Sequence, residues 1–487
     1  MTTLGALFEG LIPFDSSLSN LSVTGIVSDS RKVRPGDLFA AVAGYRQDGN
    51  AFIAEAVSRG AAAVLTDRPV EGLPIPILVT ADIRKTLALA ACRFYQNDLQ
   101  DMLIVGVTGT NGKTTITYLM ESILSHAGFS SGVIGTVSYR WPGHEETAGQ
   151  TTPGIIELLS MIQTMRRDGV NAVVMEASSH ALDQHRVTGI GFDAAIFTNL
   201  TRDHLDYHQN MEAYGAAKAR FFSLLKPSGT GVVNADDPAH DLMISSANGR
   251  CVTYAIASEA DYRVEDIRTA DGVTRFSIRR NGESIQISTP LLGRFNILNV
   301  TAAVAAGIEL GLDRESVLAG IATMSKVRGR METITSANGF RVVIDYAHTP
   351  DALENVLSAA REFTSRRLVV VFGCGGDRDR GKRPQMGRIA SKLADQVFVT
   401  SDNPRSEKPE AIVLDILNGI EAKRKAVAVV DRKLAIQSAL EEARPGDTVV
   451  IAGKGHETYQ QIGSEKIPFD DAAVAESVLR SLGVWKG

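Results

Sequence analysis

The chain has 487 residues, of which 44% are hydrophobic and 22% charged, so its apolar content suffices for roughly three soluble globular domains. The net charge of −5 argues against a general nucleic-acid-binding protein, because such proteins usually carry a basic excess. The three cysteines are too scattered for a CxxC metal site or a disulfide framework, no apolar run reaches the roughly 20 residues of a membrane span, and the start of the chain lacks signal-peptide features, so we expect a cytoplasmic protein.

Three regions follow one another along the chain. Residues 1–98 contain short strand signals and one helical stretch, which predict a small α/β domain. Residues 99–329 begin with a strand, a glycine loop and a helix, and then alternate apolar strands with helices. This alternation predicts a mostly parallel sheet with helices on both faces. Residues 330–487 contain four more strand signals and form a third α/β region, so the predicted fold class is a three-domain α/β protein.

The strongest chemical signal is the segment GVTGTNGKTT at residues 106–115. Glycine-rich loops of this kind turn their backbone N–H groups around phosphate oxygens, and the helix that follows directs its N-terminal dipole at the anion. Lys113 adds a positive charge, and Thr114 has the hydroxyl that usually reaches Mg²⁺. Val107 stands where the strict P-loop pattern has its first glycine. The alternative is a glycine turn without a ligand, but the flanking strand and helix favour a phosphate site.

Metal-capable side chains follow two further strands of the same region. Glu176 ends one strand, and Asp203, His204, Asp206 and His208 follow the next. Ligands of open α/β sheets lie outside the carboxyl ends of the strands, so these loops could meet in one crevice. The His/Asp group could also be a solvated loop. A zinc site is disfavoured because no thiolate accompanies it and the phosphate loop points to Mg²⁺.

Lys218 lies within an apolar helical stripe. The spacing places Tyr214, Lys218, Phe221, Phe222 and Leu225 on one helical face. A lysine there is costly unless it is paired, extends its ammonium to the rim, or is chemically changed. An amine that has taken up CO₂ as a carbamate would become a Mg²⁺-binding anion, and both interpretations stay open at this point.

Polar residues also mark strand ends and helix starts towards the C-terminus. Asn296 and Asn299 lie at a helix start, where capping could explain Asn296. Asp345 and His348 follow a strand and are either turn residues or contacts to a nucleotide. Two glycine-rich strand exits, at 372–383 and 451–457, face the same end of the third region, together with the segment SDNPR.

The turn Asp402-Asn403-Pro404-Arg405 contains one residue that a turn does not need. Asp, Asn and Pro are ordinary turn formers, whereas Arg405 brings a planar, permanently charged fork to the end of a buried strand. Arg378 and Glu457 lie in the neighbouring strand exits. We therefore predict a strand-end crevice in the third region that bears Arg378, Arg405 and Glu457, with an ion pair between Arg405 and Glu407 as the alternative use of the arginine.

These motifs resemble the Mur ligase family. GTNGKTT, MEASSHAL, NLTRDHLDYH, YGAAKARFF, NADDP, GRFNILN, GRME and DYAHTPDAL occur in that family's order across all three regions. Within the family, DNPR is similar to the members that add meso-2,6-diaminopimelate to UDP-MurNAc-L-Ala-D-Glu, whereas the lysine-adding members lack the arginine. Diaminopimelate is lysine with an extra carboxylate, which a guanidinium can grip through two parallel hydrogen bonds.

The resemblance implies a role for each matching residue. It implies that 1–98 binds the UDP-sugar, 99–329 binds ATP, and 330–487 is a Rossmann-like domain that binds the amino acid. ATP would contact Gly109, Thr110, Asn111, Gly112, Lys113, Thr114, Thr115, Asn296, Asn299, Arg330, Asp345 and His348. Mg²⁺ would be held by Thr114, Glu176, His204 and a carbamate on Lys218, so that Lys113, His204 and N6-carboxylated Lys218 form the catalytic set. The UDP-MurNAc dipeptide would contact Ser28, Ser30, Tyr45, Arg46, Gln47, Thr151, Thr152, Ser178, Gln184 and Arg186, and diaminopimelate would contact Arg378, Asp402, Asn403, Pro404, Arg405, Gly453 and Glu457.

Some positions depart from the family pattern. Ser28, residues 45–47 and Gln150 stand where relatives often have other residues, which leaves contact details open. The resemblance implies acyl-phosphate chemistry by a monomer whose domains close during turnover. The alternatives are the same reaction with L-lysine, a folylpolyglutamate synthase, whose loop usually continues Gly-Lys-Gly-Ser, and a P-loop ATPase that needs no acceptor.

Overall fold

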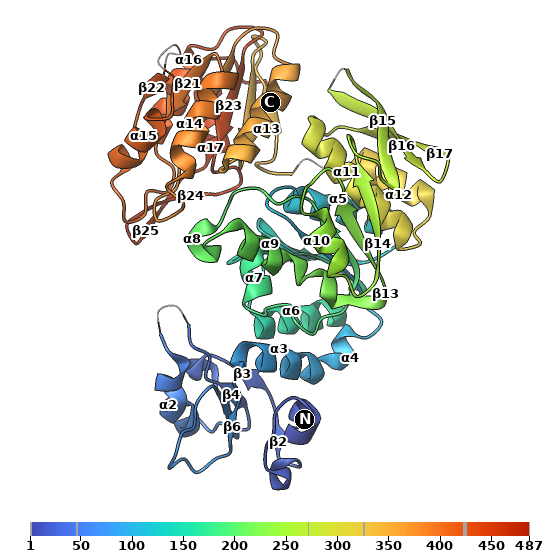
Figure 1. Cartoon of the computed structure of the whole chain (residues 1–487). Helices are drawn as coiled ribbons and strands as arrows, with labels where there is room; N and C mark the ends of the chain where they lie inside the picture. Colours follow the sequence, from blue (N-terminus) through green and yellow to red (C-terminus); the bar gives the residue numbers. More distant parts are fainter. Residues whose placement is uncertain (1, 45–46, 271, 325–326, 422–425, 487) are drawn as a thin grey trace.

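The computed structural model describes residues 2–44, 47–270, 272–324, 327–421 and 426–486. Three bodies follow one another along an elongated molecule, with the N-terminal region at one end and the C-terminal region at the other (Figure 1). Within the described residues, no helix combines the length and the apolar character needed to cross a bilayer.

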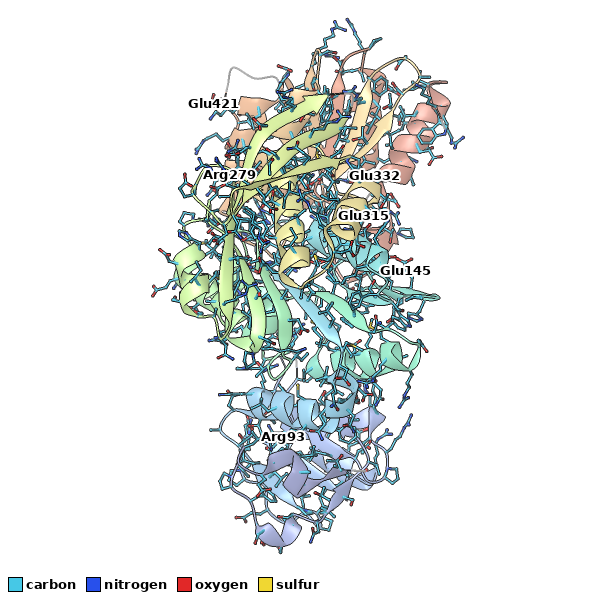
Figure 2. The ribbon with its side chains drawn as sticks, turned by 90° about the vertical axis from the view of Figure 1, so that its right-hand side faces the viewer. Arg93, Glu145, Arg279, Glu315, Glu332 and Glu421 are labelled. Atoms are coloured by element: carbon cyan, nitrogen blue, oxygen red, sulfur yellow. The ribbon has the colours of Figure 1, made fainter. Side chains whose placement is uncertain are left out.

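The N-terminal body is built on a small parallel sheet. Its strands lie in the order β3 (Ile26–Val27), β4 (Leu38–Ala40), β5 (Ala63–Thr66) and β6 (Ile77–Val79). The other elements are β1 (Thr2–Thr3), α1 (Leu4–Phe8), β2 (Ser22–Val23), α2 (Ile53–Ser58), α3 (Ile83–Phe94) and α4 (Gln96–Leu99). Helix α3 was not predicted. Its Arg93, labelled in Figure 2, donates to the carbonyls of Leu7 and Glu9 and so fastens α3 to the start of the chain.

The central body contains an eleven-stranded sheet in the order β10-β9-β8-β11-β7-β12-β13-β14-β15-β16-β17. The strands are β7 (Leu103–Thr108), β8 (Ser131–Ile134), β9 (Ser138–Trp141), β10 (His144–Thr147), β11 (Ala172–Glu176), β12 (Phe192–Phe197), β13 (Leu225–Asn234), β14 (Arg250–Ala255), β15 (Tyr262–Ala270), β16 (Val273–Arg280) and β17 (Glu283–Thr289). Neighbours from β8 to β15 are parallel, as predicted. The antiparallel strands at both edges were not predicted, although the Asn281-Gly282 turn, with both residues at positive φ, is a hairpin signal.

Helices cover both faces of this sheet. One core contains side chains of α5 (Lys113–His126), α11 (Arg294–Glu309) and α12 (Arg314–Thr323). The other contains side chains of α6 (Ile155–Arg167) and continues without a break into α3 of the N-terminal body. The remaining helices are α7 (Ser179–Asp183), α8 (Leu205–His208), α9 (Met211–Ala219) and α10 (His240–Ser245).

Two local predictions in this body need correction. Helix α9 ends at Ala219 and a 3-10 turn follows at Phe222–Leu224, so the predicted apolar stripe is not one helical face, although all five of its side chains are buried. The N-cap of α11 is Gly293, not Asn296. Asn296 lies inside the first turn, and its side-chain amide donates to the Leu292 carbonyl at 2.8 Å.

The C-terminal body is a six-stranded sheet in the order β18-β19-β23-β20-β21-β22. Its strands are β18 (Glu332–Thr335), β19 (Arg341–Asp345), β20 (Leu368–Phe372), β21 (Gln396–Val399), β22 (Ala426–Ala428) and β23 (Thr448–Ala452), and only β18 is antiparallel to its neighbour. Helices α13 (Pro350–Glu362), α14 (Lys382–Leu393) and α15 (Pro409–Leu417) pack on one face, and α16 (Arg432–Glu441) and α17 (Asp471–Ser481) on the other. A hairpin of β24 (Tyr459–Ile462) and β25 (Glu465–Pro468) completes the body, and the four predicted strands are confirmed.

Candidate active site

The glycine loop lies between β7 and α5 and is tightly enclosed. Gly109 has a φ of 148°, and a Cβ there would lie 1.7 Å from Thr198 Oγ1. Gly112, with a φ of 89°, is the N-cap of α5, so no side chain covers the first N–H groups of that helix. Lys113 Nζ donates to the carbonyls of Gly109 and Thr110, both at 2.9 Å. The loop therefore has the backbone freedom and the lysine that a phosphate site requires.

Neighbouring segments hold the tip of the loop in place. Asn111 N donates to Asn199 Oδ1 at 3.0 Å, and Thr198 Oγ1 donates to the Asn111 carbonyl at 2.6 Å. The Asn111 side-chain amide donates to Asp351 Oδ2 of the C-terminal body at 2.7 Å. Sequence reasoning missed Thr198, Asn199 and Asp351 as site residues. The first two stand directly after a recognised strand, whereas Asp351 is 240 residues away in the chain.

Thr114 and Glu176 meet beside the loop, as predicted. Thr114 Oγ1 donates to Glu176 Oε1 at 2.9 Å and accepts from Arg330 Nη2 at 3.1 Å. Thr136 binds both carboxylate oxygens of Glu176, through its N at 2.9 Å and its Oγ1 at 2.8 Å. A hydroxyl and a carboxylate are hard oxygen donors of the kind that Mg²⁺ prefers.

This donor set fits Mg²⁺ only if a further anion joins it. Among the described residues, no three His, Cys, Asp or Glu side chains are placed to hold a metal ion. Glu176 and His204 are the two residues of those types in the predicted set. The set therefore depends on the Thr114 hydroxyl and on a change in the chemistry of Lys218.

Lys218 is buried without a counter-charge. Its side chain is on α9 and only 1% exposed, and its Nζ lies 4.4 Å from the centre of the Tyr214 ring. In the described part of the chain, no carboxylate lies within ion-pair distance of this amine. Burial, reinforced by the charge of Lys113, holds the pKa of Lys218 well below its usual range. Burial therefore favours the neutral, nucleophilic form of this amine.

His204 lies next to this amine in a cluster of aromatic side chains. Its backbone has a φ of 53°, and its Nε2 lies 3.4 Å from Asp203 Oδ2. Its ring centre is 4.8 Å from that of His180, which sequence reasoning did not single out. Burial lowers the pKa of His204 to about 3, although Asp203 opposes this shift, so the imidazole is neutral and able to act as a ligand.

The predicted nucleoside contacts come from both sides of the junction between the central and C-terminal bodies. Asn296 and Asn299 are buried on α11, and Asn299 Oδ1 lies 2.5 Å from where a Cβ on Gly112 would be. Asp345 ends β19 and accepts from the backbone N–H groups of Met331 and Ala347. His348 Nε2 lies 3.7 Å from Asp203 Oδ2. Residues predicted from three motifs thus meet around the phosphate loop.

A large hollow separates the N-terminal body from the central one. Its volume is about 1570 Å³, and its lining includes Ser28, Gln150, Gln184 and Arg186. The rest of its charged lining is mixed: the basic residues are Arg31, Lys32, Arg34, Arg84 and Arg167, and the acidic residues are Asp29, Asp37, Glu146, Glu157 and Asp168. Arg186 donates to Gln184 Oε1 at 2.8 Å and also contacts Gln150. An anionic ligand in this hollow would therefore depend on individual cations such as Arg84 and Arg186 and not on an overall positive lining.

Among the described residues, the other predicted sugar and peptide contacts are not part of the lining of this hollow. Ser30 is buried and donates to Glu55 Oε2 at 2.7 Å, while Gln47 is exposed. Tyr45 and Arg46 lie outside the described residues. Thr152 Oγ1 donates to the Glu176 carbonyl at 2.7 Å and accepts from Ser178 N at 3.1 Å, and Thr151 Oγ1 accepts from Thr136 Oγ1 at 3.2 Å. Thr151 and Thr152, which follow Gln150 of the lining, thus connect the hollow to Glu176.

The DNPR turn is held by the loop after β23. Asn403 Nδ2 donates to Glu457 Oε2 at 2.8 Å, and the fully buried Lys454 bridges Asn403 Oδ1 and Glu457. Asp402 Oδ2 is buried without a hydrogen-bond partner, and a Cβ on Gly453 would lie 2.6 Å from it. The predicted set of Asp402, Asn403, Gly453 and Glu457 is therefore one contiguous cluster.

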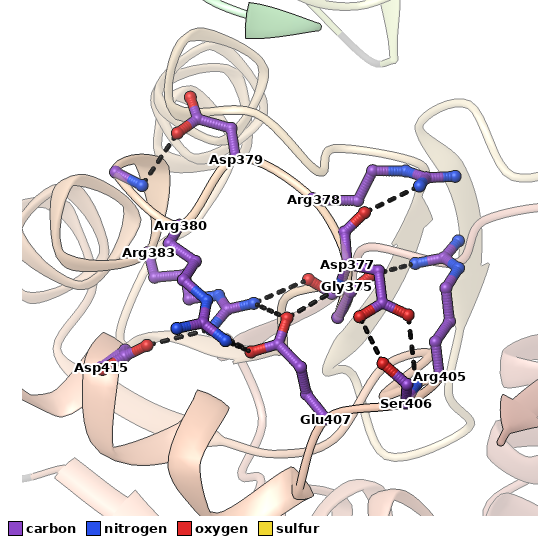
Figure 3. A network of polar contacts seen from close by, with 12 residues as sticks. Gly375, Asp377, Arg378, Asp379, Arg380, Arg383, Arg405, Ser406, Glu407 and Asp415 are labelled. Carbon is purple, nitrogen blue, oxygen red and sulfur yellow. Dashed lines mark hydrogen bonds and ion pairs between the residues drawn. The ribbon is translucent and has the colours of Figure 1, made fainter. Parts of the chain in front are cut away.

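Arg405 has no acidic partner among the described residues. Its backbone has a φ of 51°, and its Nη1 donates to the Gly376 carbonyl at 2.8 Å. The predicted alternative, an ion pair with Glu407, is wrong, because Glu407 pairs with Arg383 at 2.7 Å and Arg380 at 2.8 Å. Arg378 donates to the Asp377 carbonyl, and Figure 3 shows Arg378 and Arg405 on the same side of this loop. Two guanidinium groups are thus available at the turn.

Comparison with known proteins identifies the family to which this chain belongs. Three domain models match the chain: "Mur ligase family, catalytic domain" at residues 22–95, "Mur ligase middle domain" at 107–307 and "Mur ligase, glutamate ligase domain" at 329–455. The chain belongs to the Mur ligase family. A relative named UDP-N-acetylmuramoyl-L-alanyl-D-glutamate--2,6-diaminopimelate ligase, from Synechococcus elongatus, is 46% identical over 94% of each chain.

Solved structures of Mur ligases and related enzymes share the fold. A structure of a UDP-N-acetylmuramoyl-L-alanyl-D-glutamate--2,6-diaminopimelate ligase has a TM-score of 0.72 and 35% identity, and the match covers 99% of this chain and 100% of that one. Folylpolyglutamate synthase from Mycobacterium tuberculosis has a TM-score of 0.62 and 19% identity, over 76% of this chain and 92% of that one. The second likeness is one of fold alone.

Proposed function

We propose that this chain is an ATP-dependent amide ligase that adds meso-2,6-diaminopimelate to UDP-MurNAc-L-Ala-D-Glu, with release of ADP and phosphate. The observation that supports this substrate is Arg405, a guanidinium beside the Asn403–Glu457 cluster that has no acidic partner among the described residues. Diaminopimelate has a carboxylate that would pair with this fork, and L-lysine has none. The names of the full-length relatives support the same reaction.

Each body of the molecule then has one substrate. We assign the UDP-sugar to 1–98 and the hollow beside it, ATP to 99–329, and the amino acid to 330–487. The hollow reaches Gln184 and Arg186, which suits a ligand that extends from the N-terminal body towards Glu176. We further propose that the chain works as a monomer in the cytoplasm, where ATP is available.

The residues of the chain support two chemical steps. The loop N–H groups and Lys113 hold the γ-phosphate while the D-glutamyl carboxylate attacks phosphorus, which gives an acyl phosphate and ADP. The amine of the incoming amino acid then attacks the acyl carbon, phosphate leaves, and the amine loses a proton. Both steps develop charge on oxygens, which fixed N–H donors and Lys113 stabilise.

Thr114, Glu176, His204 and a carbamate on Lys218 would hold Mg²⁺, which when bound would offset the charge of the phosphate oxygens. In carbamate formation the neutral amine attacks CO₂, an N–C bond forms and a proton leaves, so a buried base becomes an anion. The low pKa of Lys218 and the absence of an acid beside it among the described residues support this modification.

Lys218→Met tests the carbamate. The variant keeps the apolar stem and loses the amine, so we expect it to fold with unchanged or higher stability, because the buried amine has no counter-charge. Phosphate release should fall by roughly a thousandfold, the scale of losing a positioned electrostatic group. A ¹³C-bicarbonate experiment should give a carbamate resonance in the wild type and none in the variant. A Lys218→Met enzyme with near-normal turnover would contradict the assignment.

Phosphate release with ATP, Mg²⁺ and UDP-MurNAc-L-Ala-D-Glu tests the function. Wild type should need diaminopimelate and respond poorly to L-lysine, by roughly 10⁴-fold in kcat/KM. Arg405→Ala should lose roughly a hundredfold of kcat/KM for diaminopimelate, because a charge-assisted paired contact is removed. Arg388→Ala, an exposed arginine on α14, is the matched control.

The other arms distinguish the alternatives. Equal turnover with L-lysine would remove Arg405 as the selector. Release without any amino acid or acceptor would indicate a plain ATPase, and turnover with a folate and glutamate would indicate a folylpolyglutamate synthase.

A further inference from the structure

Two acidic residues, Asp377 and Glu407, belong to the same loop cluster as Arg405, and neither forms an ion pair with it in the part of the chain that the structure describes. The Asp377 carboxylate accepts from Ser406, through Oγ at 2.6 Å and N at 3.2 Å. The Glu407 carboxylate points away, towards α14. Figure 3 shows Arg378 and Arg405 on one side of the Gly375–Asp377 segment, and Glu407 with Arg383 on the other. The Arg405 guanidinium therefore pairs with neither of the two acids of this loop cluster.

Glu407 has no capacity left for another cation. Its Oε1 accepts from Arg383 Nη2 at 2.7 Å and from Asp377 N at 2.6 Å. Its Oε2 accepts from Arg383 Nη1 at 3.0 Å and from Arg380 Nη2 at 2.8 Å. The hydrogen bonds from Arg383 lower the pKa of Glu407 to about 2, so the group is ionised at every physiological pH. A free Glu407 carboxylate would therefore compete with any substrate carboxylate for Arg405.

Arg383 is the group that occupies this carboxylate. Its side chain is 1% exposed on α14, and it binds Glu407 through both terminal nitrogens and Asp415 at 2.9 Å. Its Nε is buried without a hydrogen-bond partner. Buried ion pairs often contribute little net stability, because desolvation offsets the attraction. This pair involves Glu407, which follows the DNPR turn by two residues, so it can affect substrate binding as well as stability.

We propose that Arg383 is a specificity-determining positioning residue: by holding Glu407 in a two-point ion pair, it leaves the substrate as the source of the anion that pairs with Arg405. This inference rests on the proposed function. A chain without Arg383 would release Glu407 two residues from Arg405, as an internal mimic of the substrate's distal carboxylate. Excluding an internal competitor is a way to gain specificity without an added substrate contact.

The proposal predicts that the two halves of the ion pair are not equivalent. Loss of Arg383 frees the Glu407 carboxylate, which can then compete with diaminopimelate for Arg405. Loss of the Glu407 carboxylate frees only arginines, which cannot compete for Arg405. A purely structural pair would behave symmetrically, since either change breaks the same contact. Asymmetry in KM therefore separates the two roles.

The experiment measures kcat and KM for diaminopimelate, with ATP and acceptor saturating, in four variants of the full chain. Arg383→Met should raise KM by about tenfold with kcat nearly unchanged, the size expected for an internal charged competitor. Glu407→Gln should keep KM within about threefold of wild type. The double variant Arg383→Met/Glu407→Gln should return KM towards the Glu407→Gln value. Arg380→Gln, which removes an exposed contact to the same carboxylate, is the matched control.

Two outcomes would overturn the proposal: equal KM increases in Arg383→Met and Glu407→Gln, or a double variant as impaired as Arg383→Met. Thermal unfolding checks that each variant folds. If Arg383→Met does not fold, Arg383→Lys replaces it. The ammonium introduced in this variant would bind Glu407 at one point only, so part of the Glu407 carboxylate would be released. KM for diaminopimelate should then rise by about threefold in Arg383→Lys and fall again when Glu407→Gln is added. The proposed function is tested separately, by whether the wild type needs diaminopimelate for phosphate release. If it does not, the proposed function fails; if it does and KM is the same in Arg383→Met as in the wild type, only the role of Arg383 fails.

Discussion

The two junctions between the bodies of this molecule differ in the side chains that form them. The N-terminal and central bodies share one hydrophobic core, in which side chains of α3 and α6 pack together. Most of the contacts described between the central and C-terminal bodies are polar: Asn111 with Asp351, Arg330 with Thr114, Arg202 with Asp379, and His348 with Asp203. A small non-polar contact joins α11 and α13, where a Cβ on Gly293 would lie 2.7 Å from Ala359 Cβ. Among the described residues, the buried cores of the C-terminal body contain no side chain of the central one.

This difference assigns a mechanical role to each junction. A continuous apolar core resists separation because opening it would expose buried surface at about 25 cal/mol per Å². Polar contacts at a partly exposed junction exchange with water at little net cost. We infer that the C-terminal body moves during turnover while the N-terminal body stays fixed, so that closure occurs on the amino-acid side of the phosphate loop.

The largest effect is expected in the shared core. Ile162 on α6 is fully buried there, and Ile162→Ala should lower the free energy of unfolding by about 2–5 kcal/mol. Urea unfolding followed by Trp141 fluorescence reports the central body, and Trp485 reports the C-terminal one, in the matched Trp→Phe variants. In Ile162→Ala, the N-terminal and central bodies should unfold together, so the Trp141 transition should move to a lower urea concentration. The Trp485 transition should stay where it is in the wild type. Leu414→Ala, at a 58% exposed site, should change stability by less than about 0.5 kcal/mol. If the N-terminal body unfolded independently of the central one, the shared core would not be the stronger of the two junctions.

The next effect depends on pH and belongs to the C-terminal body. Glu407 has its pKa lowered from 4.5 to about 2, mainly by the hydrogen bonds from Arg383. A depressed folded pKa means that the unfolded chain binds the proton first, so this stabilisation is complete above pH 4.5 and is lost as pH falls towards 2. Up to about 3 kcal/mol should disappear across this window. Glu407→Gln should remove that dependence in the Trp485 transition and leave the Trp141 transition unaltered; equal shifts in both would argue for one cooperative unit.

The smallest effect should come from the polar junction itself. Arg202 is 42% exposed and pairs with Asp379 at 2.9 Å, so Arg202→Ala should cost less than about 1 kcal/mol. The same change should let the C-terminal body open, seen as a larger radius of gyration in small-angle scattering without ligands. Arg220→Ala removes an ion pair within the central body and should leave the radius unchanged. A wild-type radius that does not contract with nucleotide and acceptor would count against closure.

Local sequence signals predicted the site where its parts are adjacent in the chain. The strand, glycine loop and helix around Lys113 form one continuous segment, and so does the DNPR turn after β21. The apolar surroundings of Lys218 were also predictable, because burial follows from composition even though α9 ends earlier than its periodicity suggests.

The remainder of the site depends on contacts between distant segments. Asn111 and Asp351 lie on different bodies, and no local pattern indicates that they meet. The partner of Glu407 could not be chosen from spacing, because Arg405 is nearer in the chain than Arg383, and the outcome depends on the direction of α14. The antiparallel strands β15–β17 were missed because their polar faces gave no apolar run, so the turn at Asn281-Gly282 was the main signal.

The core shared by α3 and α6 also limits how this chain can recombine with its relatives. An N-terminal segment inherited from another Mur ligase would bring its own α3 surface to an α6 that was selected against a different partner. Overpacking or cavities at such a mismatched face typically cost 1–3 kcal/mol per site. The C-terminal body is less constrained in this way, because its contacts with the central body are mostly polar. Gene fusion and domain exchange should therefore be tolerated at the second boundary, and the amino acid used by the enzyme should be the easiest of its three substrates to change.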